Sequence, residues 1–251
     1  MPAALGNAYE ERFQRDGHLS MLKGKKKPTE VQKRGWQGHF LFLAGMFLSR
    51  LLLRLRYKGK SHIPQEGAYL LVANHQSMVD GLWIMGGLPS RQLPRFSAIG
   101  GSDLEQSYGL TGRILFRVGK VIPIDRHGNP LRGLLLAKKA IENQAIVMIH
   151  PEGTRTHDGW IGEMKNGAAY LANKTGVPVI PVYISGAYEA FSRHMSVPHP
   201  IDWKRLRRKK VTVEYCPPII PHDYPAVDDL MEAINQVLYA KEAEILGVRT
   251  P

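Results

Sequence analysis

The segment from Asn74 to Asp80 carries residue types that could perform acid–base chemistry. It reads Asn-His-Gln-Ser-Met-Val-Asp, which places a carboxylate five residues after an imidazole. Residues five apart on one continuous helix point about 140° apart, so His75 and Asp80 can meet only if a turn intervenes and Asp80 stands near a helix start. Asp80 would then orient the imidazole, and His75 would take a proton from a substrate hydroxyl. A satisfied structural histidine is the alternative.

Two further segments deliver an arginine after an apolar run. His150–Arg155 reads His-Pro-Glu-Gly-Thr-Arg, and Gly119–Arg126 reads Gly-Lys-Val-Ile-Pro-Ile-Asp-Arg. Gly153 would let the backbone approach a ligand closely, and the planar guanidinium of Arg155 suits a phosphate. The plain alternatives are a polar turn with an exposed arginine in the first segment and a surface ion pair, which usually contributes little, in the second.

An α/β domain would position these segments. Short β-rich runs alternate with helix-like stretches from about residue 57 to 187, and this rhythm predicts a largely parallel sheet flanked by helices. Active sites gather at the carboxyl ends of such strands. Pro178 and Pro181 fit poorly inside a strand. The expected strands are Tyr69–Ala73, Arg95–Ile99, Lys120–Ile124, Ala145–Ile149, Val177–Ile184 and Val211–Tyr215, and the expected helices are Met78–Gly86, Tyr108–Arg117, Pro130–Asn143, Lys165–Lys174 and Ala226–Ile245.

We predict that residues 1–56 form a basic, amphipathic helical segment that associates with a membrane, ahead of the α/β domain of residues 57–251. Such a pattern is typical of a helix in the membrane interface, and a helix that packs on the domain is the alternative. The apolar run Phe40–Leu48 is too short to span a bilayer, which takes roughly 20 apolar residues. The helical spacing involves Ala44, Leu48, Leu51, Leu52 and Leu55, with Trp36 at the edge and Arg50 and Arg54 on another face.

The composition of the chain limits the kinds of partner that it could bind. The 251 residues fit one large domain with a small extension, and the formal net charge of +12 indicates a polyanionic partner. Nucleic acid, an anionic bilayer and phosphorylated small molecules all satisfy that condition. The single cysteine, Cys216, excludes an internal disulfide. No recognisable nucleic-acid-binding motif accompanies the charge.

Taken together, the motifs resemble those of the glycerolipid acyltransferases of the 1-acyl-sn-glycerol-3-phosphate (lysophosphatidic acid) acyltransferase type. The blocks of that family read Asn-His-x4-Asp, Ile-Asp-Arg, Pro-Glu-Gly-Thr-Arg and Val-Pro-Val-Ile-Pro-Val. This chain carries them in that order between Tyr57 and Val182, and the Pro217-Pro218-Ile219 turn fits the family's C-terminal end. The combination of the first and third blocks is highly specific.

The resemblance implies an enzyme with a mostly parallel sheet that transfers a fatty acyl group from a thioester to the sn-2 hydroxyl of 1-acyl-sn-glycerol-3-phosphate, giving phosphatidic acid in phospholipid biosynthesis. The hydroxyl would attack the thioester directly, so no acyl-enzyme, cofactor or metal is expected. His75 would be the general base and Asp80 its partner. The phosphate and glycerol of the acceptor would be bound by Arg126, Glu152, Gly153, Thr154 and Arg155.

The expected partners follow from the same resemblance. They are a lysophospholipid, an acyl thioester of coenzyme A or of acyl carrier protein, and an anionic membrane surface, with peripheral or monotopic attachment at the cytoplasmic face of the cell membrane. Nucleic acid is not expected. The basic cluster Lys204–Lys210, beside Trp203, fits lipid headgroups, the phosphates of an acyl donor or a solvated loop.

Two departures from the family pattern bear on the substrate. Many members carry basic residues in the second block, whereas the counterpart here, Gly100–Leu104, has no lysine. His150 stands where an aromatic residue such as Phe is usual, either as a packing substitution or near the headgroup. Another lysophospholipid or glycerol 3-phosphate therefore stays open as the acceptor, and a non-catalytic lipid-binding membrane protein is the rival from another class.

Overall fold

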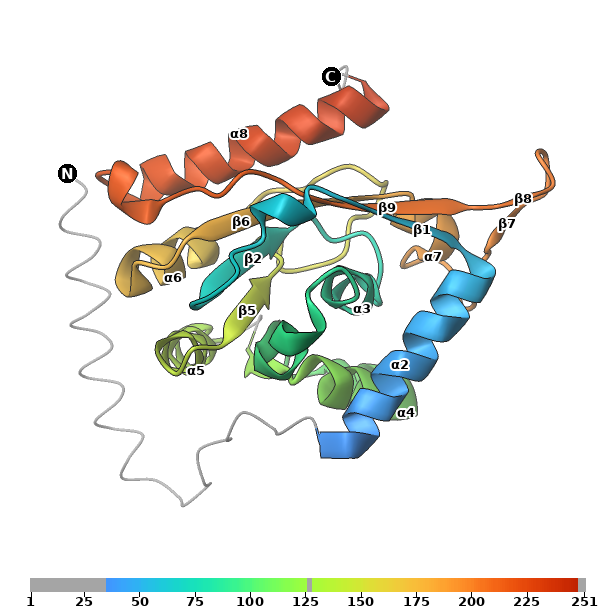
Figure 1. Ribbon diagram of the computed structural model, residues 1–251, viewed down its shortest axis with the longest axis horizontal. Coiled ribbons are helices and arrows are strands. Elements are labelled where there is room, and N and C mark those ends of the chain that lie inside the picture. Colours follow the sequence, from blue (N-terminus) through green and yellow to red (C-terminus); the bar gives the residue numbers. More distant parts are fainter. Residues whose placement is uncertain (1–34, 126–127, 248–251) are drawn as a thin grey trace. The chain divides into compact units, whose positions relative to one another are not determined.

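The computed structural model describes residues 35–125 and 128–247, which all fall within one compact unit of the chain, residues 31–251. A seven-stranded sheet of order β1-β9-β6-β2-β5-β3-β4 forms its centre (Figure 1). The five strands from β6 to β4 are parallel, while β9 runs antiparallel to β6 and pairs in parallel with β1. The strands are β1 Arg54–Lys58, β2 Tyr69–Ala73, β3 Phe96–Gly101, β4 Ile122–Ile124, β5 Ile146–Ile149, β6 Val179–Ser185 and β9 Lys210–Tyr215.

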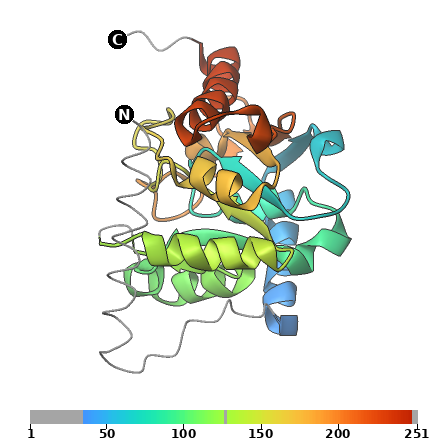
Figure 2. The same cartoon turned by 90° about the vertical axis from the view of Figure 1, so that its left-hand side faces the viewer.

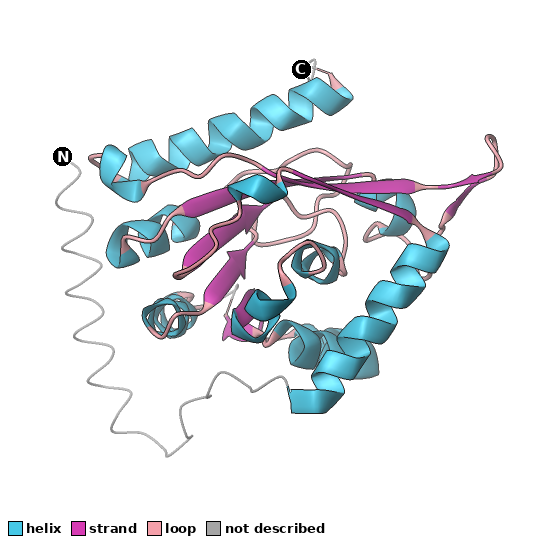
Figure 3. Cartoon of the chain, in the orientation of Figure 1, coloured by secondary structure: helices cyan, strands magenta, loops and turns pink. Residues whose placement is uncertain are grey.

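Helices cover both faces of the sheet (Figures 2 and 3). Alternate side chains of β2 point to opposite faces, as the pleat of a strand requires: Leu71 joins the core cluster under α2, α3 and α7, and Leu70 joins the cluster under α5, α6 and α8. The sheet is thus buried on both sides, which explains its continuous apolar runs. The helices are α2 Gly35–Leu52, α3 Asp80–Met85, α4 Leu104–Gly119, α5 Leu131–Glu142, α6 Gly167–Thr175, α7 Ala187–Phe191 and α8 Val227–Leu246, with short 3-10 turns η1 Lys60–His62, η2 Ser90–Arg95 and η3 Pro221–Asp223.

The predicted mostly parallel sheet flanked by helices is confirmed. Each expected strand and helix is present. Strand β2 has the predicted bounds, and the other elements differ from theirs at one end or both. Pro178 precedes the first residue of β6, as the rule for proline requires, but Pro181 lies inside this central strand. Its carbonyl still takes part in the ladder, because it accepts a 2.8 Å hydrogen bond from the backbone N–H of Cys216.

The N-terminal segment departs from its predicted pattern. Its first 34 residues lie outside the described residues. Helix α2 ends at Leu52, so Leu55, assigned to the helical stripe, and Arg54, assigned to a polar helix face, instead lie in β1 beside β9. Because β1 begins before residue 56, the boundary predicted there falls within a strand, and the division into two segments stays a prediction.

Helix α2 exposes apolar side chains on the face that points away from the protein. Phe42 and Met46 are buried in the core cluster that α2 shares with α3 and the sheet. The solvent-exposed face of the helix carries a second apolar stripe, at helical spacing, where a basic face was expected. The association of this stripe with a membrane stays a prediction. Within residues 35–125 and 128–247, none of the helices combines the length and apolarity that crossing a membrane requires. The exposed stripe consists of Trp36, Phe40, Leu43, Phe47 and Leu51.

Candidate active site

His75 and Asp80 meet at the carboxyl end of β2. Nδ1 of His75 lies 3.0 Å from Oδ2 of Asp80. The chain leaves β2 at Ala73 and turns, and α3 begins at Asp80, so the required turn and helix start are both present. A carboxylate can only accept a hydrogen bond, so the ring donates its Nδ1–H and Nε2 is the basic nitrogen of the neutral imidazole. The His75 side chain is 19% exposed and that of Asp80 is 0% exposed.

The carboxylate of Asp80 is shared between the imidazole and the turn. Its Oδ2 also accepts backbone N–H groups from Gln76 and Ser77, each at 2.7 Å. Its Oδ1 is buried and has no hydrogen-bond partner within the described part of the chain. Burial raises the pKa of Asp80 to about 7, against the lowering effect of the two backbone donors. The carboxyl group therefore changes charge near neutral pH.

The loop after β5 holds the backbone of His75 from both sides. Oε1 of Glu152 accepts the His75 N–H at 2.7 Å, and the N–H of Thr156 donates to the His75 carbonyl at 2.7 Å. The other oxygen of Glu152 accepts the Gly162 N–H at 3.0 Å. Burial raises the pKa of Glu152 to about 7. Both carboxylate oxygens thus bond to the protein itself, which gives this residue a positioning role; its predicted contact with substrate stays a prediction.

Two buried amides fasten the residues on either side of His75. The side chain of Asn74 bonds in both directions to the backbone of Ile184 in β6, accepting at 2.7 Å and donating at 2.9 Å. Oε1 of Gln76 accepts the N–H groups of Ala187 and Tyr188, each at 3.2 Å, at the start of α7. These bonds satisfy buried polar groups and fix the turn that carries the imidazole.

His150 stacks on the ring of His75. The centroids are 3.9 Å apart and the planes differ by 7°. Nδ1 of His150 lies 2.9 Å from the Ala73 carbonyl, which requires an N–H there. Desolvation of the half-buried ring, followed by the proximity of His75, lowers the pKa of His150 to about 3, so the ring is neutral near pH 7. Of the two predicted roles for His150, packing is the one that this stacking supports.

The ligand atoms of His75, Asp80 and His150 lie within 4.8 Å of one another, a separation at which a metal ion could be held. The rings are stacked and nearly parallel, so their in-plane lone pairs lie in two separate planes and do not converge on one point. Nδ1 of each ring is also hydrogen-bonded within the protein. We interpret His75 and Asp80 as an acid–base pair on which His150 packs, and the absence of a metal stays a prediction.

Three of the other predicted substrate-binding residues, Gly153, Thr154 and Arg155, lie in the loop that follows β5. Gly153 has φ +71°, a left-handed conformation that favours glycine. Thr154 is exposed. Nη2 of Arg155 donates to the Tyr108 hydroxyl at 2.6 Å, and its guanidinium lies 5.6 Å from the centre of that ring. Arg126 lies outside the described residues. Ile124, two residues earlier, ends the edge strand β4, which is separated from β2 by β5 and β3.

Several residues that support the site carried no signal in the sequence. Tyr108 of α4 and Thr156 have no charge and no motif spacing, and Gln76 occupies a variable position of its motif. Arg193 belongs to none of the motifs, and its Nη1 donates to the Arg155 carbonyl at 3.1 Å. Only the fold brings these residues together, because they come from four separate segments.

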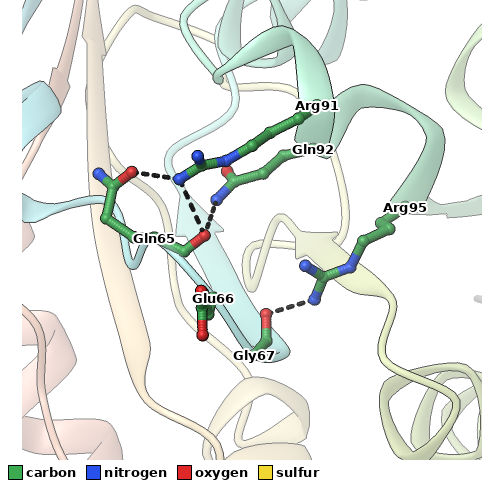
Figure 4. Close-up of a pocket in the computed structure, with 6 residues that line it drawn as sticks. All are labelled: Gln65, Glu66, Gly67, Arg91, Gln92 and Arg95. Carbon is green, nitrogen blue, oxygen red and sulfur yellow. Dashed lines mark hydrogen bonds between the residues drawn. The ribbon is translucent and has the colours of Figure 1, made fainter.

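A hollow of about 270 Å³ lies at the other end of the parallel strands. Figure 4 shows that its side chains surround the start of β2, and Arg91 donates to the Gln65 carbonyl at 3.2 Å. The guanidinium of Arg95 donates to the Gln144 carbonyl at 2.7 Å. Because these arginines are occupied by backbone carbonyls, and the amino ends of the strands lie away from His75, this hollow is not part of the site.

The chain is similar to known acyltransferases. Residues 54–185 match the acyltransferase family. Over 207 residues, 80% of this chain, it is 27% identical to a 1-acyl-sn-glycerol-3-phosphate acyltransferase of Limnanthes douglasii and covers 66% of that protein. Over 185 residues, 70% of this chain, it is 30% identical to the 1-acyl-sn-glycerol-3-phosphate acyltransferase alpha of Homo sapiens and covers 60% of it. The aligned part of the chain thus spans between 60% and 66% of the length of these relatives, which is less than two thirds.

A solved structure has the same fold. The crystal structure of the 1-acyl-sn-glycerophosphate acyltransferase from Thermotoga maritima superposes with a TM-score of 0.64 at 24% identity, over 84% of this chain and 81% of that one. The family match covers more than half of this chain and includes the turn after β2 and the loop after β5. We conclude that this chain belongs to the acyltransferase family.

Proposed function

We propose that this protein transfers a fatty acyl group from an acyl thioester to the sn-2 hydroxyl of 1-acyl-sn-glycerol-3-phosphate, giving phosphatidic acid and a free thiol carrier. The observation that carries the proposal is the contact between His75 and Asp80 at the carboxyl end of β2. The names of the relatives in Limnanthes douglasii and Homo sapiens support the choice of acceptor. Acyl-CoA and acyl carrier protein both fit as the donor.

The reaction requires one base and one activated acyl group. Nε2 of His75 takes the proton of the acceptor hydroxyl as its oxygen attacks the thioester carbonyl. The imidazolium that forms is stabilised by the ionised carboxylate of Asp80. When the tetrahedral intermediate collapses, the C–S bond breaks and the thiolate takes the proton from His75. No enzyme nucleophile is needed, and desolvation raises the pKa of the Cys216 thiol to about 11, which makes it a poor one.

The basic residues of the site would recognise the phosphate of the acceptor. The positive charge of Arg155 lowers the pKa of Asp80, although less than the other groups around that carboxyl do, which supports Arg155 as a candidate phosphate ligand. Gly153 would allow the backbone N–H groups of the loop to approach the phosphate. Arg126 and Thr154 are further candidates for the same phosphate. Since Gly100–Leu104 offers no lysine, the phosphate would depend on these arginines, and a different lysophospholipid or glycerol 3-phosphate is the second candidate acceptor.

Membrane attachment is part of the proposal because both lipid substrates are bilayer components. The exposed stripe of α2 puts Trp36, Phe40 and Phe47 in contact with solvent, which is unfavourable in water and favourable in a membrane interface. The formal charge of +12 favours an anionic surface. We propose peripheral or monotopic attachment at the cytoplasmic face.

A thiol-release assay tests the reaction. Purified protein in mixed micelles receives acyl-CoA or acyl carrier protein donors and a panel of acceptors, and lipid products are identified by mass. Release should require 1-acyl-sn-glycerol-3-phosphate and should fall by roughly 100-fold or more in His75→Ala, the range expected for a lost general base. His222→Ala, at an exposed position in η3, is the matched control and should retain full activity.

The outcomes separate the alternatives. Release with a different lysolipid keeps the mechanism and moves the acceptor. Full activity in His75→Ala would remove the proposed base. Absent release from folded protein with both donors would leave the lipid-binding alternative. Release that needs no acceptor would be thioester hydrolysis and would remove the proposed transfer reaction.

A further inference from the structure

A second apolar feature stands apart from α2, at the tip of the β7–β8 hairpin. The two short antiparallel strands, β7 Ile201–Asp202 and β8 Arg207–Arg208, frame a four-residue turn. Trp203 is 75% exposed and Leu206 is 80% exposed. Figure 1 shows the hairpin extending outward beyond β9. Large apolar side chains at the end of an extended hairpin have no core to fill.

The backbone of the turn is unusual for these residues. Leu206 has φ +46°, in the left-handed region that glycine or asparagine normally occupies. A bulky residue is disfavoured in this conformation, so leucine at position 206 does not stabilise the turn better than glycine would. Strained backbone positions cluster at functional sites, so Leu206 is a candidate for a role that its side chain performs.

Basic side chains surround the two apolar ones. Lys204, Arg205 and Arg207 are all exposed. Only Arg205 has a nearby carboxylate, at 4.0 Å in Asp202, among the ion pairs of the described residues. The tip therefore combines exposed aromatic and aliphatic groups with excess positive charge.

The hairpin is fastened to the end of α2. Nη1 of Arg208 donates to the carbonyls of Arg50 and Leu51, both at 3.0 Å. These carbonyls belong to the last turn of α2, where helical partners run out and the helix dipole is negative. The backbone N–H of Arg54 bonds to the Lys209 carbonyl at 2.9 Å. The exposed stripe of α2 and the hairpin are thus held in a fixed relation by this joint.

We propose that the β7–β8 hairpin is a second membrane anchor that selects anionic bilayers. Trp203 and Leu206 enter the interface between headgroups and acyl chains, where an aromatic ring with a polar edge is favoured. Lys204, Arg205 and Arg207 remain at headgroup depth and contact anionic lipids. The inference rests on the membrane attachment in the proposed function and extends it to a defined lipid class and a defined element.

Continuity with α2 favours a bilayer over other polyanions. A nucleic acid or an acidic carrier protein would account for the positive charge, but Leu206 would gain little from a phosphate backbone or a carboxylate-rich surface. A bilayer satisfies both the charges and the apolar tip, and it also accounts for the exposed stripe at the other side of the Arg208 joint.

Vesicle co-flotation of the full chain tests the anchor. The vesicles are phosphatidylcholine with and without phosphatidylglycerol, at low and high salt. The charge variant Lys204→Gln/Arg207→Gln should bind the anionic vesicles roughly 10- to 30-fold more weakly and neutral vesicles as wild type does. The tip variant Trp203→Ala/Leu206→Ala should bind both kinds of vesicle more weakly. The matched control Lys139→Gln/Lys174→Gln removes the same charge from exposed positions in α5 and α6 and should bind as wild type does.

Insertion itself is measured by fluorescence. Lipids brominated on the acyl chains should quench wild type more than Trp203→Phe, and the difference reports Trp203 alone. Wild-type vesicle binding by both variants, or no quenching difference, would overturn the proposal. So would a charge variant that keeps its vesicle binding but loses affinity for a single-stranded oligonucleotide or for acyl carrier protein.

Activity measurements keep the two proposals separable. In mixed micelles, where docking to a vesicle is not required, the hairpin variants should release thiol at the wild-type rate. If no protein releases thiol but the vesicle results hold, the reaction is wrong and the anchor stands. If release is normal and all variants bind vesicles equally, the anchor is wrong and the reaction stands.

Discussion

At the residue scale, the two oxygens of Asp80 have opposite surroundings. Oδ2 accepts three hydrogen bonds, including the one from His75, whereas Oδ1 is buried without a hydrogen-bond partner in residues 35–125 and 128–247. The first favours the carboxylate and the second favours the neutral acid. Burial prevails, and the pKa of Asp80 rises to about 7. Ionisation of this one side chain therefore controls whether a developing imidazolium is stabilised.

The first prediction concerns the pH dependence of the reaction. Below pH 7 Asp80 is increasingly protonated and cannot stabilise the imidazolium, so kcat should rise with pH through about 7 and then level off. Asp80→Asn should lower kcat by roughly 100- to 10,000-fold and abolish that rise. Initial rates of thiol release across this pH range measure both effects. Asp223→Asn, an exposed position in η3, is the control; a profile that stays flat through pH 7 would contradict the assignment.

The second prediction concerns His150, whose ring lies flat on that of His75. Its pKa of about 3 makes it neutral at working pH, so we expect its flat ring to matter to the site and a charge not to matter. His150→Phe should keep kcat within a few-fold of wild type, whereas His150→Ala should lose more because the stack disappears. The Phe variant leaves the Ala73 carbonyl without its donor, which costs about 1 kcal/mol of unfolding free energy. Equal losses of kcat in both variants would instead show that a ring nitrogen is needed.

At the element scale, the end of α2 depends on the distant hairpin. Arg208 supplies the donor for two carbonyls of its last turn. Arg208→Ala should lower the unfolding free energy by roughly 0.5–1 kcal/mol, because the terminal carbonyls lose a cationic partner. Urea unfolding in the absence of lipid measures the change. Arg207→Ala removes the neighbouring exposed charge and should change stability far less; equal losses would show that overall charge, not the cap, is responsible.

The elements themselves were largely predictable from the sequence. Short apolar runs such as Tyr69–Ala73 predict buried strands. The five-residue spacing of His75 and Asp80 predicts the turn before α3. The end of α2 was not predictable, because Leu55 fits a helical stripe as well as a strand. Pairing with β9, a strand more than 150 residues later, decides its structure. Local periodicity cannot report a partner so far away.

The site shows the same limit. The motif residues His75 and Asp80 were found by type and spacing, but the bonds that hold them join segments that only the fold brings together. Glu152 illustrates this best: its sequence context indicates a ligand-binding carboxylate, whereas in the structure both of its oxygens bond to backbone N–H groups. Its two hydrogen-bond partners are the backbone N–H groups of His75, before α3, and of Gly162, after β5. No pattern in the sequence indicates this pairing.

At the scale of the whole molecule, the buried titrating groups of the site change the free energy of unfolding with pH in opposite directions. Asp80 and Glu152 hold protons up to about pH 7 in the folded chain but only to about pH 4 when unfolded. Their contribution to stability is present below the unfolded pKa and is lost as pH rises through 7. His150, with its pKa lowered to about 3, acts in the other direction: it takes up a proton on unfolding below about pH 6.5. Between about pH 4 and pH 6.5, the two carboxyl groups change the free energy of unfolding more than the one imidazole does, so their loss of stability with rising pH prevails.

The last prediction isolates one of these groups. Glu152→Gln removes a carboxyl that titrates near pH 7, and its amide can accept only one of the two N–H groups, so the variant should be less stable than wild type at low pH. Its deficit should shrink as pH rises from about 4.5 to 7, by at most roughly 1.4 kcal/mol per pH unit, because only wild type must ionise a buried acid. Urea unfolding at several pH values measures the difference, with Glu66→Gln, at an exposed position, as the control. A deficit that is constant or grows with pH would mean that Glu152 is already ionised in the folded protein at low pH, and that its hydrogen bonds to the backbone of His75 and Gly162 outweigh its burial.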